Sequence, residues 1–130
     1  MALDILVVDD EADIRDLISG ILDDEGYETR SAGDSDAALQ EIEARRPSLV
    51  ILDIWLQGSR LDGLELLEEI KKMHEGLPVI IISGHGNIET AVSAIKLGAS
   101  DFISKPFETD KLLILVERAT EVDRLRREYL

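Results

Sequence analysis

Apolar residues gather in five short runs along the chain, separated by longer and more polar stretches. Three of the runs are almost continuously apolar: Asp4–Val8, Leu49–Asp53 and Pro78–Ser83. This pattern is typical of central strands in a parallel sheet, because helices cover both faces of such a sheet. The other two runs are Tyr27–Ala32, which alternates more and indicates an edge strand, and Asp101–Ser104. The sequence therefore predicts five strands.

The segment after the first run has the spacing of one helix face. Its apolar positions follow i, i+3, i+4, i+7 and i+8, at Ile14, Leu17, Ile18, Ile21 and Leu22. Such a stripe predicts an α-helix that packs against a core. Asp10 stands where an N-cap is expected, and Gly26 stands just past the expected end.

Helical patterns also follow each of the other runs. The expected helices are 36–45, with Ala38, Leu39 and Ile42 inward; 63–74; a helix marked by Ile88, Ala91, Val92 and Ile95, capped by Asn87 and stopped near Gly98; and one that begins at Thr109. Strand and helix thus alternate five times. This order predicts a single α/β domain over residues 1–130, with a parallel sheet between two helical layers.

Composition narrows the function classes. The formal net charge is −14, so a surface that binds the phosphate backbone of nucleic acid is not expected. There are no cysteines, which excludes disulfides and thiol chemistry. The N-terminus lacks the pattern of a secretion signal, and no apolar run is long enough to cross a bilayer. We therefore expect a cytoplasmic protein without membrane association.

Chemically active side chains stand at the predicted strand ends. Asp9 and Asp10 follow the first strand, Asp53 ends the third, Ser83 ends the fourth, and Lys105 follows the fifth. The carboxyl ends of parallel strands meet at one sheet edge, so these groups should converge. Carboxylates without histidine or cysteine suit Mg²⁺, Mn²⁺ or Ca²⁺ rather than zinc. An aspartate nucleophile, a lysine and such a cation together favour phosphate chemistry.

Four segments, "ILVVDDE", "LVILD", "IIISGHG" and "DFISKPF", resemble the signature segments of response-regulator receiver domains. They occur in family order and cover almost the whole chain. "DIWLQGSRLDG" and "SGHGNIETAVSAIKLGA" resemble the NtrX branch of the NtrC-type nitrogen regulators. The resemblance implies a flavodoxin-like, CheY-like (βα)₅ fold with strand order 2-1-3-4-5. It also implies a phosphorylation-dependent switch without catalytic turnover beyond its own phosphorylation and dephosphorylation.

The resemblance implies a role for each residue of the site. Asp53 matches the phosphoacceptor, Asp10 the direct Mg²⁺ ligand and Asp9 a ligand that often acts through water. The residue at the Trp55 position usually binds Mg²⁺ through its backbone carbonyl. The remaining matches are Ser83, the switch hydroxyl; Lys105, the phosphate-contacting lysine; Phe102, the aromatic that turns when the hydroxyl moves; and Lys105–Pro106, usually a cis peptide.

The implied partner is a sensor histidine kinase. Phosphorylation would change the surface of the fourth and fifth helices and the strand between them, with homodimerisation and control of a transcription output as the result. Leu112, Leu115, Ala119, Val122 and Tyr129 recur roughly as heptads, and 120–130 is expected to begin a linker helix. A stand-alone receiver that acts as an adaptor or phosphate sink stays open as an alternative. A haloacid-dehalogenase-type phosphatase is disfavoured, because Trp55 stands where that family needs a second acid.

The segment after the phosphoacceptor departs from the family pattern. Gln57 replaces a common proline, and Asp62-Gly63 arrives about two residues late. We therefore expect Gln57–Leu61 to be a mobile or bulged lid that supplies no ligands. His85 follows the fourth strand and is either an exposed loop residue or a contact to phosphate or a partner.

Overall fold

The computed structural model describes residues 3–84 and 88–128. Strand and helix alternate five times, as the sequence predicts. The elements are β1 (Asp4–Val8), α1 (Ala12–Asp24), β2 (Glu28–Ala32), α2 (Ser35–Ala44), β3 (Leu49–Asp53), α3 (Gly63–Met73), β4 (Val79–Ser83), α4 (Ile88–Lys96), β5 (Asp101–Ser104) and α5 (Thr109–Glu128). Where bounds were predicted, the observed ones agree with them or differ by one residue.

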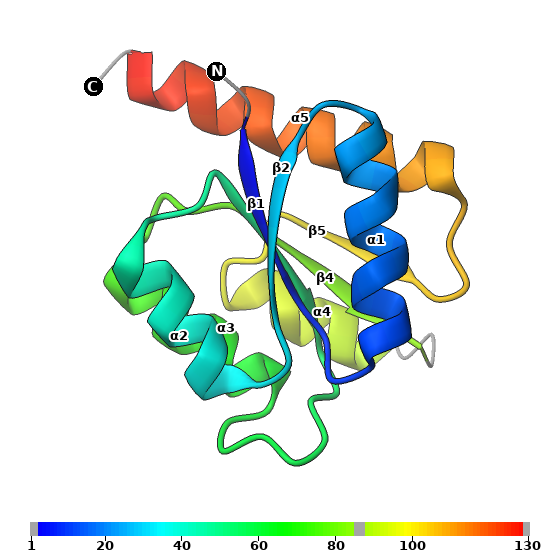
Figure 1. Ribbon diagram of the computed structural model, residues 1–130. Helices are drawn as coiled ribbons and strands as arrows, with labels where there is room; N and C mark the ends of the chain where they lie inside the picture. The colour runs from blue at the N-terminus through cyan, green and yellow to red at the C-terminus, as the bar shows by residue number, and fades with distance from the viewer. Residues whose placement is uncertain (1–2, 85–87, 129–130) are drawn as a thin grey trace.

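The five strands form one parallel sheet in the order β2-β1-β3-β4-β5, which confirms the predicted flavodoxin-like topology. β1, β3 and β4 are buried at every position, and β2 is the more exposed edge. Because all five strands run in one direction, their carboxyl ends lie along the same edge of the sheet (Figure 1). That edge carries Asp9, Asp53, Ser83 and Lys105 at or just beyond the strand ends.

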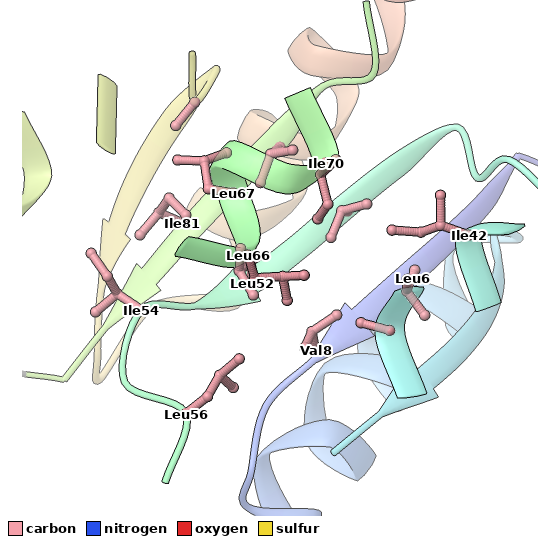
Figure 2. Close-up of a cluster of buried hydrophobic side chains, with 14 of the residues drawn as sticks. Leu6, Val8, Ile42, Leu52, Ile54, Leu56, Leu66, Leu67, Ile70 and Ile81 are labelled. Atoms are coloured by element: carbon pink, nitrogen blue, oxygen red, sulfur yellow. The ribbon is translucent and has the colours of Figure 1, made fainter. Parts of the chain in front are cut away.

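Helices cover both faces of the sheet, so the domain has two hydrophobic cores. α1 and α5 pack on one face, and α2, α3 and α4 pack on the other (Figure 1). Alternate strand residues serve the two cores, because successive side chains of a strand point to opposite faces. Figure 2 shows the second core, where Leu6, Leu52 and Ile81 of the strands meet α2 and α3. Ile54 and Leu56 continue this core beyond the end of β3.

The helices begin in different ways. The Asp34 carboxylate accepts a hydrogen bond from Ala37 N, and Asp62 and Glu65 form a capping box at the start of α3. The expected N-cap of α1 was wrong: Glu11 occupies that position, and no side chain caps the helix. Asp10 lies one residue before the N-cap, and the Asp9 carboxylate accepts the Glu11 N–H at 2.8 Å.

One predicted helix face needs correction. Leu17 was placed on the apolar stripe of α1 but is 53% exposed. In α4, Val92 and Ile95, two of the apolar positions that marked the helix, are 47% and 48% exposed, whereas Ala94 is fully buried. α4 therefore packs against the rest of the domain through its small residue. The expected cap Asn87 lies outside the described residues.

An ion-pair network stands at the start of β1, at the sheet edge opposite the carboxyl ends. Asp4 is buried and accepts hydrogen bonds from Arg30 at 2.6 and 3.1 Å and from Arg45 at 3.2 Å. Arg30 also donates to the backbone carbonyl of Glu41 at 2.7 Å. The network connects β1 and β2 with α2, far along the strands from the clustered carboxylates.

Candidate functional site

Three carboxylates converge at the carboxyl edge of the sheet. Asp9 and Asp10 leave β1, and Asp53 ends β3, so the adjacent strands β1 and β3 bring them together. One oxygen of each carboxylate lies within 4.8 Å of one oxygen of the others. Asp9 is 1% exposed and Asp53 is 4% exposed, while Asp10 is half-buried. Grouped, largely buried negative charge of this kind requires a compensating cation.

Lys105 supplies part of that compensation. Its Nζ lies 3.0 Å from Asp9 Oδ2 and 3.2 Å from Asp53 Oδ2, so it bridges the two buried carboxylates. Burial alone would lower the pKa of the ammonium, but the hydrogen bonds and charges of Asp9 and Asp53 outweigh it and raise that pKa. Lys105 therefore stays charged. Its backbone N–H donates to the carbonyl of Ser83, which fixes its place beside β4.

Asp53 is a buried acid in a mixed electrostatic environment. Burial raises its pKa, and the charge of Asp9 adds to that effect. A hydrogen bond from the Trp55 backbone N–H and the nearby Lys105 act in the opposite direction. The net pKa of Asp53 is about 6. At neutral pH the group is mainly an anion.

Asp9 and Asp10 differ in how their oxygens are used. Asp9 Oδ1 accepts from Glu11 N and Oδ2 accepts from Lys105, so both of its oxygens already have donors. Within the described part of the chain, no donor contacts the Asp10 carboxylate. Asp10 is therefore the carboxylate best able to bind a cation directly. An all-oxygen set of this size fits Mg²⁺, which takes one or two carboxylates and keeps several waters.

Ser83 and Phe102 lie on the neighbouring strands β4 and β5. Ser83 ends β4, is fully buried and pairs in register with Ser104. Phe102 is half-buried and packs against the core beneath α2, α3 and α4. The peptide bond between Lys105 and Pro106 is cis. His85 lies outside the described residues.

Trp55 stands at the mouth of the site, and its side chain is 48% exposed. With Leu56, Gln57 and Asp62 it lines a pocket of about 370 Å³. The following segment is attached to α2. Ser59 Oγ accepts from Ser35 N at 2.8 Å, Ser35 Oγ accepts from Leu61 N at 3.1 Å, and Arg60 pairs with Asp36 at 2.8 Å. Gln57–Leu61 is thus a folded extension beside α2, and none of its residues belongs to the carboxylate cluster.

Two residues that shape the site were missed by the sequence analysis. Arg15 of α1 donates from Nη1 to the backbone carbonyl of Asp9 at 2.6 Å. Gly63 lies so close to the backbone of Asp53 and Ile54 that no Cβ would fit there. A basic residue in the first turn of a helix, where the macrodipole disfavours it, was a usable signal for Arg15. Gly63 was noted only as part of the Asp62-Gly63 pair, which did not predict its close approach to the end of β3.

The comparisons agree with this geometry. The sequence profile described as "Response regulator receiver domain" matches residues 5–117. The nitrogen assimilation regulatory protein NtrX of Azorhizobium caulinodans is 67% identical over 128 residues, which cover 98% of this chain and 28% of that protein. Among solved structures, NtrX from Brucella abortus in complex with ADP has a TM-score of 0.96 and 68% identity, over 99% of this chain and 29% of that one.

The receiver domain of NtrX from Brucella abortus, solved alone, is similar over 91% of this chain and 98% of its own, with a TM-score of 0.89 and 70% identity. The chain therefore spans a little over a quarter of the full-length relatives that it matches. No helix in the described ranges is long and apolar enough to pass through a bilayer.

Proposed function

This chain belongs to the response regulator receiver domain family, in its NtrX-like branch, and on that premise we propose that Asp53 is the phosphoacceptor of a signalling switch driven by a sensor histidine kinase. One observation carries the assignment. Asp53 is a buried carboxylate at a strand end, bridged to a second carboxylate by Lys105. Beside it lies Asp10, whose carboxylate no donor contacts in the described part of the chain. A nucleophile, a fixed cation and a cation-binding acid thus share one edge of the sheet.

The proposed reaction transfers a phosphoryl group from a phosphohistidine to Asp53. A carboxylate oxygen of Asp53 attacks phosphorus, and an O–P bond forms as the P–N bond breaks. The electron pair of the broken bond stays on the imidazole nitrogen, which takes a proton from solvent. Loss of the phosphoryl group reverses the charge change: a water oxygen bonds to phosphorus and gives up a proton to solvent, while the bond between phosphorus and the Asp53 oxygen breaks and leaves a carboxylate.

The residues around Asp53 have separate tasks in this proposal. Lys105 offsets charge on the phosphoryl oxygens, since its ammonium already contacts Asp53. Asp10 and Asp53, with the Trp55 carbonyl, would hold Mg²⁺ directly, and Asp9 would act through water. Mg²⁺, when bound, would supply positive charge that offsets the negative charge of the transferring group. Asp9 also orients Lys105 through a 3.0 Å ion pair.

Phosphorylation adds charge and strong hydrogen-bond acceptors at the sheet edge. We propose that Ser83 turns toward the phosphoryl group and that Phe102 moves into the vacated space. Both residues stand on strands that support α4 and α5, so the α4-β5-α5 surface would change. Homodimerisation through that surface would then control an output domain in transcription regulation. The exposed Val92 and Ile95 of α4 give this face the apolar area that such contacts use.

The full-length relatives extend well beyond the part that this chain matches, and we propose that the output depends on such further domains. In this proposal residues 1–130 are the receiver, and 120–130 begin a linker helix to output domains. α5 continues to Glu128, in line with that role. A stand-alone adaptor or phosphate sink is the alternative, and the full open reading frame distinguishes the two.

Intact mass spectrometry tests the phosphoacceptor directly. The domain is incubated with acetyl phosphate, with and without Mg²⁺, and we expect the mass of one phosphoryl group to be added only with Mg²⁺. Asp53→Asn abolishes the addition, whereas the matched control Asp36→Asn, an exposed carboxylate on α2, retains it. Phosphorylation that persists in Asp53→Asn, or that does not need Mg²⁺, would overturn the proposal.

A further inference from the structure

Arg15 holds the peptide unit that joins Asp9 to Asp10. The carbonyl oxygen that accepts from Arg15 Nη1, at 2.6 Å, belongs to the peptide bond between those two acids. The orientation of that peptide plane determines where Asp10 leaves the backbone. Arg15 therefore contacts the peptide group that precedes Asp10 and, among the described residues, makes no hydrogen bond to the Asp10 carboxylate.

The rest of Asp9 is also fixed. Its N–H donates to the carbonyl of Ala32 at 3.1 Å, and its two carboxylate oxygens accept from Glu11 and Lys105. Only the carbonyl orientation remains for Arg15 to set. Asp10 itself has no hydrogen-bond donor among the described residues, so its position depends on the backbone that carries it.

The position of Arg15 is electrostatically unusual. It lies in the first turn of α1, where the helix dipole disfavours a cation. A cation near a Mg²⁺ site would also repel the metal. A side chain at such a place gains most from the specific hydrogen bond that it makes, here a charge-assisted bond to a half-buried carbonyl.

Gly33 lies against the guanidinium group of Arg15. A Cβ built on Gly33 would lie 3.2 Å from Arg15 Nη1 and 3.7 Å from its Cζ. The connection between β2 and α2 therefore stands directly against Arg15, and only a residue without a side chain leaves it undisturbed. The backbone of Gly33 is not left-handed, so alanine is tolerated there except for this contact.

From these contacts we propose that Arg15 is a positioning residue for cation binding: it fixes the Asp9–Asp10 peptide and thereby presents Asp10 to Mg²⁺. The inference rests on the proposed function, because it assigns Asp10 to the metal. Gly33 acts in the same unit by leaving room for the guanidinium group.

Replacement of Arg15 distinguishes a positioning role from a simple charge effect, because the two predict opposite changes in Mg²⁺ affinity. Loss of a positive charge near the site should tighten Mg²⁺ binding by electrostatics alone. Positioning predicts that Arg15→Met weakens Mg²⁺ binding by about tenfold, a typical effect of losing an outer partner of a metal ligand. Arg15→Lys keeps a charged donor and should recover part of the affinity. Affinities are measured by calorimetry and by Trp55 fluorescence, with no phosphodonor present.

Arg60→Met is the matched control. It also removes one positive charge, but Arg60 bonds to the exposed Asp36 carboxylate and not to the Asp9 carbonyl. We expect its Mg²⁺ affinity to equal or exceed that of the parent chain. An Arg15→Met affinity that equals or exceeds the parent value would overturn the proposal.

Gly33→Ala disturbs the same contact by placing a methyl group against the Arg15 guanidinium, and it changes no charge. It should weaken Mg²⁺ binding by about threefold to fivefold, a smaller effect because the guanidinium is displaced rather than lost. In the Arg15→Met background the same change should have no further effect. Equal effects of Gly33→Ala in both backgrounds would contradict a shared role.

A rate measurement separates this inference from the function on which it rests. At saturating Mg²⁺, Arg15→Met should be phosphorylated by acetyl phosphate at close to the parent rate, because only the metal affinity has changed. A parent chain that binds no Mg²⁺ would overturn the proposed function and the inference together. A parent chain that binds Mg²⁺ and is phosphorylated, with an unchanged Arg15→Met variant, would overturn the inference alone.

Discussion

The ammonium group of Lys105 donates a hydrogen bond of 3.2 Å to the carboxylate of Asp53, from a position 52 residues away in the sequence. The same nitrogen reaches Asp9 at 3.0 Å. Lys105 thus balances negative charge on two buried acids. Its removal should affect cation binding and phosphoryl transfer in different directions.

Lys105→Met should bind Mg²⁺ as tightly as the parent chain or more tightly, because a competing positive charge is lost. Phosphorylation by acetyl phosphate should slow by at least about tenfold, because charge on the transferring group is no longer offset. Calorimetry measures the first quantity and intact mass the second. Lys96→Met, an exposed lysine of α4, is the control. A loss of Mg²⁺ affinity that accounts for the whole rate loss would show that Lys105 acts through the metal site.

Asp53→Asn should stabilise the domain at neutral pH. The pKa of Asp53 is about 6 in the folded chain, against 3.8 for an ordinary aspartate side chain. The folded state therefore holds the proton more tightly, and the wild-type domain loses stability as pH rises from about 4 to about 6. The asparagine variant escapes that loss, and its free energy of unfolding should be higher by about 1–3 kcal/mol at pH 7.

Urea unfolding with EDTA present, at pH 7 and at pH 4, measures this difference. The gain should shrink toward zero at pH 4, where Asp53 is largely protonated in the folded wild-type chain. Asp36→Asn removes an exposed carboxylate and should change little at either pH. A gain of equal size at both pH values would mean that charge burial is not its source.

Asp4→Asn should destabilise the fold without touching the site. The buried Asp4 carboxylate accepts two hydrogen bonds from Arg30, whose side chain is 16% exposed. Without that carboxylate the largely buried guanidinium group of Arg30 loses its shortest ion pair, and the free energy of unfolding should fall by about 2–4 kcal/mol. Arg45→Met removes the exposed arm of the network and should lower it by less than about 1 kcal/mol. Mg²⁺ affinity should stay unchanged in both, as calorimetry can verify.

Gly63→Ala should be among the most damaging single-methyl additions in the domain. The added Cβ would lie closer than 3 Å to backbone atoms of Asp53 and Ile54, which cannot move without displacing the end of β3. We expect a loss of at least about 3 kcal/mol in the free energy of unfolding. Gly20→Ala is the matched control, because nothing lies within 4 Å of its added Cβ in α1. The free energy of unfolding of Gly20→Ala should rise by about 0.5–1 kcal/mol. Chemical denaturation measures this quantity for both variants.

The sequence predicted the strands well because burial on both faces leaves an unambiguous apolar run. Leu49–Asp53 has the bounds expected, and the convergence of Asp9, Asp10 and Asp53 follows once the strands are parallel. Helix faces were harder. Val92 and Ile95 are exposed although their spacing is helical, because spacing defines a stripe but does not say which structure it meets.

Contacts between distant residues escaped the sequence analysis. The Ser35–Ser59 hydrogen bond joins positions 24 residues apart, so no local sequence pattern predicted that the loop after Trp55 is attached to α2. The Arg15 contact depends on the direction in which one long side chain folds back over its helix start. Both features arise from the assembled fold. The loop attachment has no local sequence pattern, and the basic residue early in α1 marks Arg15 as unusual without showing which atom it contacts.

The two ends of the segment 55–62 meet at one point, where Gly63 N donates to the Ile54 carbonyl at 3.1 Å. The segment is therefore a loop whose two ends are joined by this backbone hydrogen bond. The Ile54 N–H in turn donates to the carbonyl of Ile82 in β4. Because these hydrogen bonds fix the backbone, residues added within the loop need not displace Asp53. Doubling the length of a flexible loop costs only about 0.6 kcal/mol. The loop is therefore a permissive insertion point, where a lineage can vary its surface, or an experimenter can introduce a reporter peptide, a few residues from the reactive carboxylate.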